Sequence, residues 1–425
     1  MKKTLKTLVI SVLALQIKNL RKKHSFKVVG VVGGIGKTST KLAIAQTLGK
    51  SLRVRYQEGN YNDIVSVPLI FFGSPLPSLL NPFAWLGVFI QNSKQIKGAY
   101  PYDVVVVELG TDGPGQIAAF QKYLHLDIAV ITAIVPEHME YFADMQAVAR
   151  EEIAVSAYSD KIIYNADLVA EEFVSLLPSN KESYSLQSTS ATFYAANIFH
   201  SAGGYEGDVK RNGDMFAHFS HEVVSETQLY SLLAAVSVSA ELGLKPTDIL
   251  DGIATIKPVS GRLRRLRGIN SSVIIDDTYN ASPEAVKAGL QTLYKIDAPQ
   301  KIAILGNMNE LGAMSPNAHK EIGDMCDPTK LQLVVTIGPD ASQYLAPAAT
   351  SRGCTVKSFD NPYEAGEYVQ GKIEPGAVIF AKGSQNGVFA EEAVRLLLAD
   401  PEDAVKLVRQ SRYWQKQKAK SFKRS

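Results

Sequence analysis

The sequence has little cysteine, little net charge and no long uninterrupted apolar run. Cys326 and Cys354 are the two cysteines among 425 residues, and they give neither a disulfide framework nor a metal-binding spacing. This scarcity favours a reducing, cytoplasmic setting. A formal net charge of +3 is too small to indicate a nucleic-acid partner. The sequence also shows no internal repeat with a period of about 20–50 residues.

The N-terminus combines basic residues with a short apolar run. Three lysines lie within the first six residues, before the apolar run Leu8–Leu15, and further basic residues follow the run at once. The run is shorter than the roughly 20 apolar residues that span a bilayer, and no small-residue cleavage site follows it. We expect residues 5–23, within an N-terminal segment 1–25, to form an amphipathic helix that packs on the following domain. Peripheral membrane contact and a targeting signal are the alternatives.

Short β-branched runs recur along the chain with helical stretches between them. Nearly continuous apolar strands that alternate with helices are typical of parallel sheets covered on both faces. A segment with one proline, two glycines and four arginines, 258–268, interrupts this pattern. The sequence therefore predicts an α/β protein with a large domain at 26–260 and a smaller one at 261–425. The expected strands are Val28–Val32, Val104–Leu109, Ile128–Val135, Lys161–Tyr164, Val273–Asp277, Lys301–Leu305, Leu333–Ile337 and Ala377–Ala381.

Residues 68–98 are unusually rich in large apolar side chains, among them Phe71, Phe83 and Trp85. One interpretation is a buried loop and helix. The other is an exposed apolar surface for a protein partner or for lipid.

A glycine-rich loop connects the first expected strand to a helix expected at 38–48. In this context, glycines let backbone N–H groups close around phosphate oxygens, and the helix N-terminus adds the positive end of its dipole. We expect Lys37 to reach the β- and γ-phosphates of ATP and the Thr38 hydroxyl to bind Mg²⁺. Val31 stands at the first glycine of the common spacing, and a tight turn without nucleotide is the alternative. The predicted nucleotide-binding residues of the loop are Gly33, Gly34, Gly36, Lys37, Thr38 and Ser39.

Glu108 and His138 follow two further expected strands. Ligands of open α/β sheets bind at the carboxyl ends of the strands, so Glu108 is placed to hold Mg²⁺ beside the phosphates. His138 can ligate a second metal ion through its neutral imidazole. A turn-capping acid and a structural histidine are the respective alternatives.

These segments resemble the Mur ligase family. Residues 30–39 resemble the ATP loop of Mur ligases and folylpolyglutamate synthetases, residues 108–117 resemble the matching Mur segment, and residues 137–142 resemble the family's His-Leu-Glu-x-Phe motif. The resemblance implies a P-loop NTPase-like central Mur ligase domain with a mainly parallel sheet. A smaller, Rossmann-like C-terminal domain would follow it.

Glu152 stands where the family places a lysine that is carbamylated in several members. A glutamate supplies an anionic oxygen ligand directly, so we expect Glu152 to act as a carboxylate of the metal shell. The alternative is that Glu151 and Glu152 are both solvated helix charges.

Two segments of the second domain also resemble this family. Residues 257–263 resemble its Gly-Arg-Leu linker, which implies that Arg262 contacts the γ-phosphate, because a guanidinium matches phosphate oxygens in a fork. Residues 274–283 resemble the Asp-Asp-Ser/Thr-Tyr-Asn-Ala-Asn-Pro motif of the members that add D-alanyl-D-alanine. This implies that Asp277 lies at the ribose and that Tyr279 and Asn280 lie near the nucleotide.

Further segments add detail and departures. Residues 306–312 with His319, and residues 382–384, resemble segments of the same subfamily and are expected near the incoming amine. Thr227 and Ser231 replace a histidine and an asparagine of the family. Only 29 residues precede Gly30, too few for the family's separate UDP-sugar-binding domain. We expect either a protein partner that supplies UDP recognition or a different hold on the carboxylate substrate.

The resemblance implies an ATP- and Mg²⁺-dependent amide ligase that works through an acyl-phosphate. Lys37, Glu108, His138 and Arg262 would carry the chemistry. The expected reaction adds D-Ala-D-Ala to a UDP-N-acetylmuramoyl peptide in peptidoglycan precursor synthesis. The alternatives are a Mur-type ligase for another carboxylate and a non-catalytic ATP-binding partner subunit. We expect the basic tail 416–424 to be a solvated helix end followed by disorder rather than a nucleic-acid arm.

Overall fold

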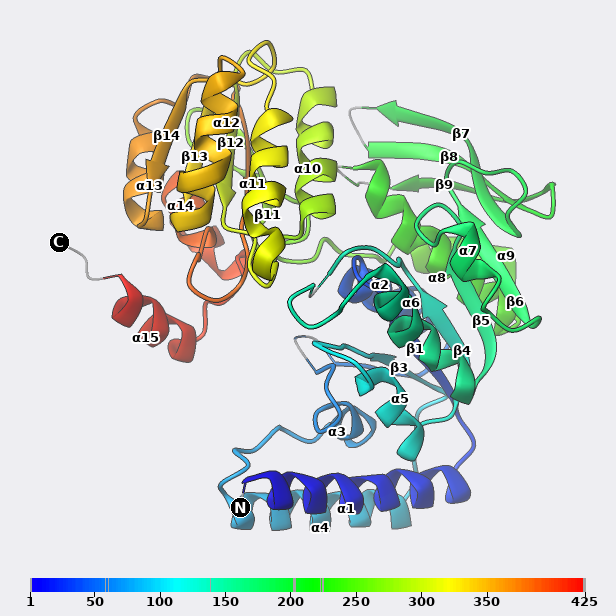
Figure 1. Ribbon diagram of the computed structural model, residues 1–425. Helices are drawn as coiled ribbons and strands as arrows, with labels where there is room; N and C mark the ends of the chain where they lie inside the picture. The colour runs from blue at the N-terminus through cyan, green and yellow to red at the C-terminus, as the bar shows by residue number, and fades with distance from the viewer. Residues whose placement is uncertain are drawn as a thin grey trace. The chain divides into compact units, whose positions relative to one another are not determined.

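Two sheets organise the chain, one in each of two units (Figure 1). The computed structural model describes residues 2–57, 59, 61–137, 139–201, 204–221, 223 and 225–422. Unit 1 consists of residues 1–135, 141–222 and 227–257, and unit 2 consists of residues 136–140, 223–226 and 258–425.

The sheet of unit 1 is parallel over most of its width. The pairs from β2 to β7 are parallel, and β8 and β9 extend the sheet as antiparallel strands. The central strand β1 is buried along five of its six residues, because helices cover both faces of the sheet. In sheet order the strands are β2 (Val54–Arg55), β3 (Val104–Glu108), β1 (Lys27–Val32), β4 (Leu126–Ile131), β5 (Ser159–Asn165), β6 (Lys181–Ser185), β7 (Phe193–Ser201), β8 (Gly204–Arg211) and β9 (Asp214–His221).

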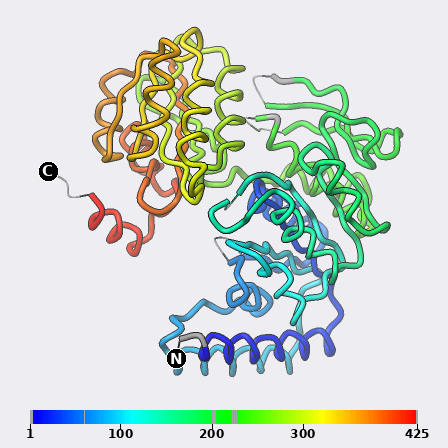
Figure 2. Tube along the Cα trace, in the orientation of Figure 1, coloured from blue at the N-terminus to red at the C-terminus, as the bar shows by residue number. Residues whose placement is uncertain are grey.

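The helices of unit 1 form three groups. The first comprises α2 (Lys37–Gly49), which contacts α8 (Leu229–Glu241) and α9 (Pro246–Ile253). The second comprises α5 (Gln116–Ala119), α6 (Met145–Ile153) and the 3₁₀ helix η2 (Ala154–Tyr158). In the third, α1 (Lys2–Lys23) contacts α3 (Val67–Phe72) and α4 (Pro82–Lys97), and Figure 2 traces α1 and α4 side by side. The short α7 (Glu171–Val174) follows β5.

The sheet of unit 2 lies between two helical layers. Successive residues of its strands point to opposite faces, so Ile274 belongs to one apolar core and Ile275 to the other. The core with Ile275 includes α10 (Pro283–Lys295), α11 (Ser315–Asp324) and α12 (Ala346–Ser351). The core with Ile274 includes α13 (Pro362–Gln370) and α14 (Glu391–Leu397). In sheet order the strands are β10 (Arg264–Arg267), β11 (Val273–Asp277), β15 (Val378–Lys382), β12 (Lys301–Gly306), β13 (Leu333–Ile337) and β14 (Val356–Phe359), all parallel except β10.

The predicted fold class is confirmed. All eight expected strands are present, with ends that differ by a few residues, and the helix expected at 38–48 is α2. Residues 68–98 are buried in part and exposed in part: Phe71 on α3 is buried, whereas Phe83 on α4 is exposed, and the binding of a protein partner or lipid there stays a prediction. The helix expected at 5–23 is α1. None of the helices in the described part of the chain has both the length and the apolar character needed to cross a membrane.

Candidate functional site

The glycine loop is fixed to its surroundings by backbone hydrogen bonds. Gly36 caps α2 with φ 83°, a left-handed conformation that glycine adopts without strain. The Gly34 N–H donates to the Ala133 carbonyl at 3.0 Å. The Lys37 ammonium donates to the carbonyls of Gly33 and Gly34. The lysine that the sequence predicts at the phosphates therefore lies over the loop at the N-terminus of α2.

The carboxylate of Glu108 lies beside this loop at the end of β3. It is 4% exposed, and one of its oxygens accepts a hydrogen bond from the Thr38 hydroxyl at 3.2 Å. Its other oxygen lies 3.2 Å from the ammonium of Lys41, a side chain buried to 1% exposure one helical turn after Lys37. Sequence reasoning missed Lys41, although its four-residue spacing from Lys37 places both lysines on one face of α2.

Two adjacent glutamates of α6 reach different loops. One Glu152 oxygen accepts the Gly33 N–H at 2.8 Å, so this carboxylate contacts the phosphate loop. Glu151 accepts the Gly115 N–H at 2.6 Å and the Ile117 N–H at 2.7 Å. Both glutamates are buried, at 6% and 3% exposure for Glu151 and Glu152, so the interpretation as solvated helix charges is wrong.

The donor atoms at this loop are compatible with Mg²⁺. Within the described ranges, no three histidine, cysteine, aspartate or glutamate side chains gather into a metal-binding cluster. Mg²⁺ in nucleotide sites takes one or two carboxylates together with phosphates and water, and it prefers oxygen ligands. The Thr38 hydroxyl and the Glu108 carboxylate, 3.2 Å apart, are such donors. His138 lies outside the described residues.

In unit 2, two consecutive aspartates at the end of β11 organise the neighbouring loops. Asp276 is fully buried and accepts hydrogen bonds from the Gly261 N–H and from the Thr278 N–H and hydroxyl. Burial raises the pKa of Asp276 to about 6, against the opposing effect of the Thr278 hydrogen bonds. Asp277 accepts the Leu263 N–H at 3.2 Å and pairs with the Lys382 ammonium at 2.5 Å.

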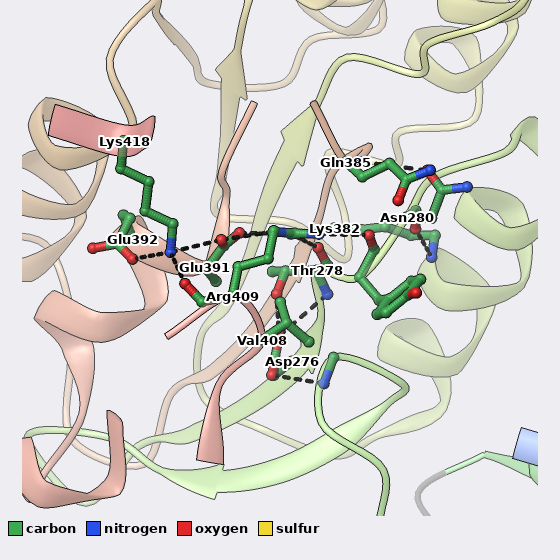
Figure 3. A network of polar contacts seen from close by, with 12 residues as sticks. Asp276, Thr278, Asn280, Lys382, Gln385, Glu391, Glu392, Val408, Arg409 and Lys418 are labelled. Atoms are coloured by element: carbon green, nitrogen blue, oxygen red, sulfur yellow. Dashed lines mark hydrogen bonds and ion pairs between the residues drawn. The ribbon is translucent and has the colours of Figure 1, made fainter. Parts of the chain in front are cut away.

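Lys382 joins this group from the end of β15. Its ammonium also donates to the Asn280 carbonyl at 2.9 Å (Figure 3). Burial lowers the pKa of Lys382, and the adjacent Asp277 carboxylate opposes this shift. The Arg262 guanidinium lies 4.2 Å from the centre of the Tyr279 ring, a cation–π contact. The structure thus brings the four residues predicted in this unit, Arg262, Asp277, Tyr279 and Asn280, into one group of contacts.

The loop after β12 is linked to the same group. The Asn309 N–H donates to the Ser384 hydroxyl at 2.9 Å, and that hydroxyl donates to the Ala281 carbonyl at 3.0 Å. His319 is fully buried, and its Nε2 accepts the Met308 N–H at 3.0 Å. Burial lowers the pKa of His319, which agrees with a neutral ring that accepts at Nε2. His319 therefore supports the loop backbone.

A buried ion network contacts the backbone of the Asp276–Asn280 loop (Figure 3). Arg409 donates to the carbonyls of Thr278 and Tyr279 at 2.6 and 2.9 Å, and it pairs with Glu391 at 2.7 Å. The Lys418 ammonium on α15 (Arg412–Ser421) lies 2.9 Å from Glu391, and 2.5 Å from its neighbour Glu392. Lys418 is fully buried, so the expectation of a solvated tail is wrong at this position. The sequence does not predict this network, because most of its members lie far apart along the chain and become neighbours only when the chain folds.

The comparisons with known proteins point to one family. The Mur ligase middle domain model matches residues 90–239, and the Mur ligase glutamate ligase domain model matches residues 261–385. A curated UDP-N-acetylmuramoyl-tripeptide–D-alanyl-D-alanine ligase from Bacillus subtilis is 25% identical over 386 residues, which cover 88% of this chain and 76% of the relative. The Synechocystis enzyme of that name is 25% identical over 91% of this chain and 77% of its own length.

Solved structures share the fold. The MurF ligase from Thermotoga maritima in complex with ADP has a TM-score of 0.74 at 22% identity, covering 94% of this chain and 84% of its own. The folylpolyglutamate synthase of Mycobacterium tuberculosis complexed with ADP and AMPPCP has a TM-score of 0.65 at 18% identity, covering 93% and 98%. Both Mur domain models and the shared fold lead to the same conclusion. The chain belongs to the Mur ligase family.

Proposed function

We propose that this protein is an ATP-dependent carbon–nitrogen ligase that joins a carboxylate to an amine through an acyl-phosphate. The proposed substrates are a UDP-N-acetylmuramoyl tripeptide and D-Ala-D-Ala, the compounds that appear in the names of its relatives. The observation that carries the proposal is the phosphate loop, with Lys37 over the N-terminus of α2 and Thr38 hydrogen-bonded to Glu108. We further propose a cytoplasmic location, where ATP and nucleotide-linked precursors are found.

The proposed chemistry relies on charge neutralisation. The substrate carboxylate attacks the γ-phosphorus, the bond to the β-phosphate oxygen breaks, and ADP leaves. Lys37 and Arg262 would stabilise the charge on the transferred phosphoryl group. The amine nitrogen then attacks the acyl carbon, inorganic phosphate leaves, and the amine gives up a proton.

We also propose that the reaction requires a divalent cation bound at the phosphate loop. Mg²⁺ supplies positive charge that offsets the negative charge on the phosphate oxygens. Thr38 and Glu108 are proposed to hold Mg²⁺ beside the phosphates, His138 is proposed to ligate a second ion, and Glu152 is proposed as a further carboxylate of the metal shell. Asp277, Tyr279 and Asn280 are proposed to contact the nucleoside part of ATP, with Lys382 holding the Asp277 carboxylate in place.

The test is substrate-dependent phosphate release. Purified protein with ATP and Mg²⁺ is expected to release phosphate only when both the muramoyl tripeptide nucleotide and D-Ala-D-Ala are present, with the ligated product detected by mass. Lys37→Ala should reduce this rate by about 10²-fold or more, because it removes a charge that acts on the transferred phosphoryl group. Lys50→Ala, at an exposed lysine just after α2, is the matched control and should keep the wild-type rate.

The other outcomes are equally informative. Phosphate release with a different acid and amine would support the proposed ligase activity but show that the substrates are different ones. ATP binding without any release would favour a non-catalytic partner subunit. Absence of ATP binding, or binding unaffected by Lys37→Ala, would overturn the proposal.

A further inference from the structure

The third helical group of unit 1 contains two long helices that run in the same direction. Gln16 on α1 donates to the Phe89 carbonyl of α4 at 2.8 Å and accepts from Asn92 at 2.9 Å. Farther along both helices, Lys23 donates to the Lys97 carbonyl at 2.5 Å. The contacts of Gln16 and Lys23 occur in the same order along both helices, so α1 and α4 run parallel. The two helices lie side by side in Figure 1. We call this pair the α1–α4 layer.

Each helix of the layer buries one face and exposes large apolar side chains on the other. Leu13 on α1 and Trp85 on α4 are buried in a shared apolar cluster. The two exposed apolar residues of α1 are seven positions apart. On α4, the second and third lie three and seven positions after the first. These spacings place them on one side of each helix, so each helix has one apolar stripe. The exposed residues are Leu8 (60%), Leu15 (59%), Phe83 (84%), Leu86 (55%) and Ile90 (50%). Leu80, in the segment before α4, adds a further 60% exposed side chain.

The charge of the layer has one sign. α1 carries seven basic residues and α4 carries two, and neither helix contains an aspartate or a glutamate. The whole chain has a formal net charge of only +3, so the rest of the protein is net negative. The exposed lysines Lys18 and Lys22 of α1, and Lys94 and Lys97 of α4, lie toward the C-terminal ends of the helices. Because the helices are parallel, these four lysines lie toward one end of the layer, and exposed Lys6 adds a basic residue near the other end.

We propose that the α1–α4 layer binds the surface of an anionic lipid bilayer. Helices that lie in a membrane interface insert an apolar face and place lysines among acidic headgroups. Lysine side chains suit this position because their stems pack on apolar surface while the ammonium stays in water.

The composition of the layer favours lipid over a protein partner. Protein interfaces are enriched in aromatic residues and arginine and depleted in lysine, whereas most of the large exposed side chains here are leucine, isoleucine and lysine, with Phe83 as the one exposed aromatic side chain of the two helices. A second copy of the chain would bring two surfaces of like charge together, which opposes association. An anionic bilayer complements both the charge and the apolar stripes.

The test is co-sedimentation of the full chain with vesicles of phosphatidylcholine, with or without phosphatidylglycerol. We expect binding to the anionic vesicles, much weaker binding to the neutral ones, and weaker binding as NaCl concentration rises. Phe83→Ser combined with Ile90→Ser should lower the partition coefficient by about tenfold or more, and so should Lys94→Glu combined with Lys97→Glu. These positions are exposed, so the variants should melt like the wild type.

Matched control variants test whether the loss of vesicle binding is specific to the α1–α4 layer or follows from losing any exposed apolar or basic residue. Leu176→Ser changes another exposed apolar residue of unit 1, and Lys50→Glu with Lys122→Glu reverses two exposed lysines outside the layer. Both controls should bind anionic vesicles like the wild type. No binding to anionic vesicles, or equal binding to both kinds, would overturn the proposal. A dimer that is lost in Phe83→Ser would do so as well, because it would identify a second copy as the occupant.

Discussion

The carboxylate of Glu152 accepts a hydrogen bond from the phosphate loop, and we propose that it also helps to hold Mg²⁺. Two substitutions separate these roles. Glu152→Gln keeps an oxygen for the Gly33 N–H but removes the negative charge, whereas Glu152→Ala removes both. If the charge supports the metal, Glu152→Gln should raise the Mg²⁺ concentration for half-maximal activity by about 10–100-fold. An unchanged Mg²⁺ dependence in both variants would assign this carboxylate to loop support alone.

Asp276 gives the fold a defined pH dependence. Its folded-state pKa of about 6 lies above the ordinary value of 3.8, because burial disfavours the charged form. The folded state therefore holds this proton more tightly than the unfolded state. Stability from Asp276 is fully present below about pH 4 and is lost as the pH rises through about 6.

We expect this dependence to disappear in Asp276→Asn, which stays neutral at all pH values. The stability of the variant relative to the wild type should rise between about pH 4 and pH 6, by about 3 kcal/mol. Denaturant unfolding of the unit 2 transition at several pH values measures it. Asp360→Asn, at an exposed position, should track the wild type throughout. A constant difference between Asp276→Asn and the wild type would contradict the assignment.

The sequence predicts residues at this scale where local spacing carries the information. Gly36, Lys37 and Thr38 are recognisable because consecutive residues form the loop. The contact between Gly33 and Glu152 spans 119 positions, so no local pattern reveals it. Spacing from Lys37 places Lys41 on the loop-facing side of α2, but its partner Glu108 becomes a neighbour only when β1 and β3 pair.

At the scale of elements, the C-terminal helix α15 is anchored by one buried lysine. Lys418 reaches Glu391, Glu392 and the Arg409 carbonyl, and Arg409 in turn holds the backbone of Thr278. Burial opposes ionisation of Glu392, but hydrogen bonding and charge from Lys418 lower its pKa overall. The helix is therefore coupled to the loop that begins at Asp276.

Removing that lysine should be costly. Lys418→Met leaves buried carboxylates without one of their cations, and we expect a loss of about 3–5 kcal/mol in the stability of unit 2. Lys416→Met, at an exposed position of the same helix, should stay within about 0.5 kcal/mol of the wild type. Denaturant titration followed by circular dichroism distinguishes the two. Equal stabilities would show that the network contributes little to the fold.

Three of the strands that the sequence does not predict share a physical reason. Strands β7, β8 and β9 pair as antiparallel neighbours with bulges, so their apolar pattern is irregular. One local signal was present: Asn212 and Gly213 both have positive φ at the turn between β8 and β9, a sequence pair typical of tight hairpins. Most of the parallel strands that the sequence does predict are buried along nearly their whole length and read as continuous apolar runs, whereas β2, β6 and β14, which it does not predict, are parallel strands that are only partly buried.

At the scale of the whole molecule, unit 2 carries a complete sheet with an apolar core on each face. Nearly all of its residues lie in one continuous stretch from Pro258 onward. We expect a fragment of residues 258–422 to fold by itself and to unfold in one cooperative transition, since domains with their own core do so. Thermal melting of the fragment, followed by circular dichroism, measures this. A broad, non-cooperative melt would show that the stretch depends on the rest of the chain.

The two tryptophans of the sequence fall one in each unit. Trp85 is buried between α4 and its neighbours, and Trp414 on α15 lies 6.2 Å from Phe389, ring centre to ring centre. Each indole is thus an intrinsic fluorophore on one of two helices discussed above, α4 and α15. With Trp414 replaced by phenylalanine, tryptophan emission comes from Trp85 and reports on the α1–α4 layer alone. With Trp85 replaced instead, it reports on the anchoring of the last helix, without any added dye.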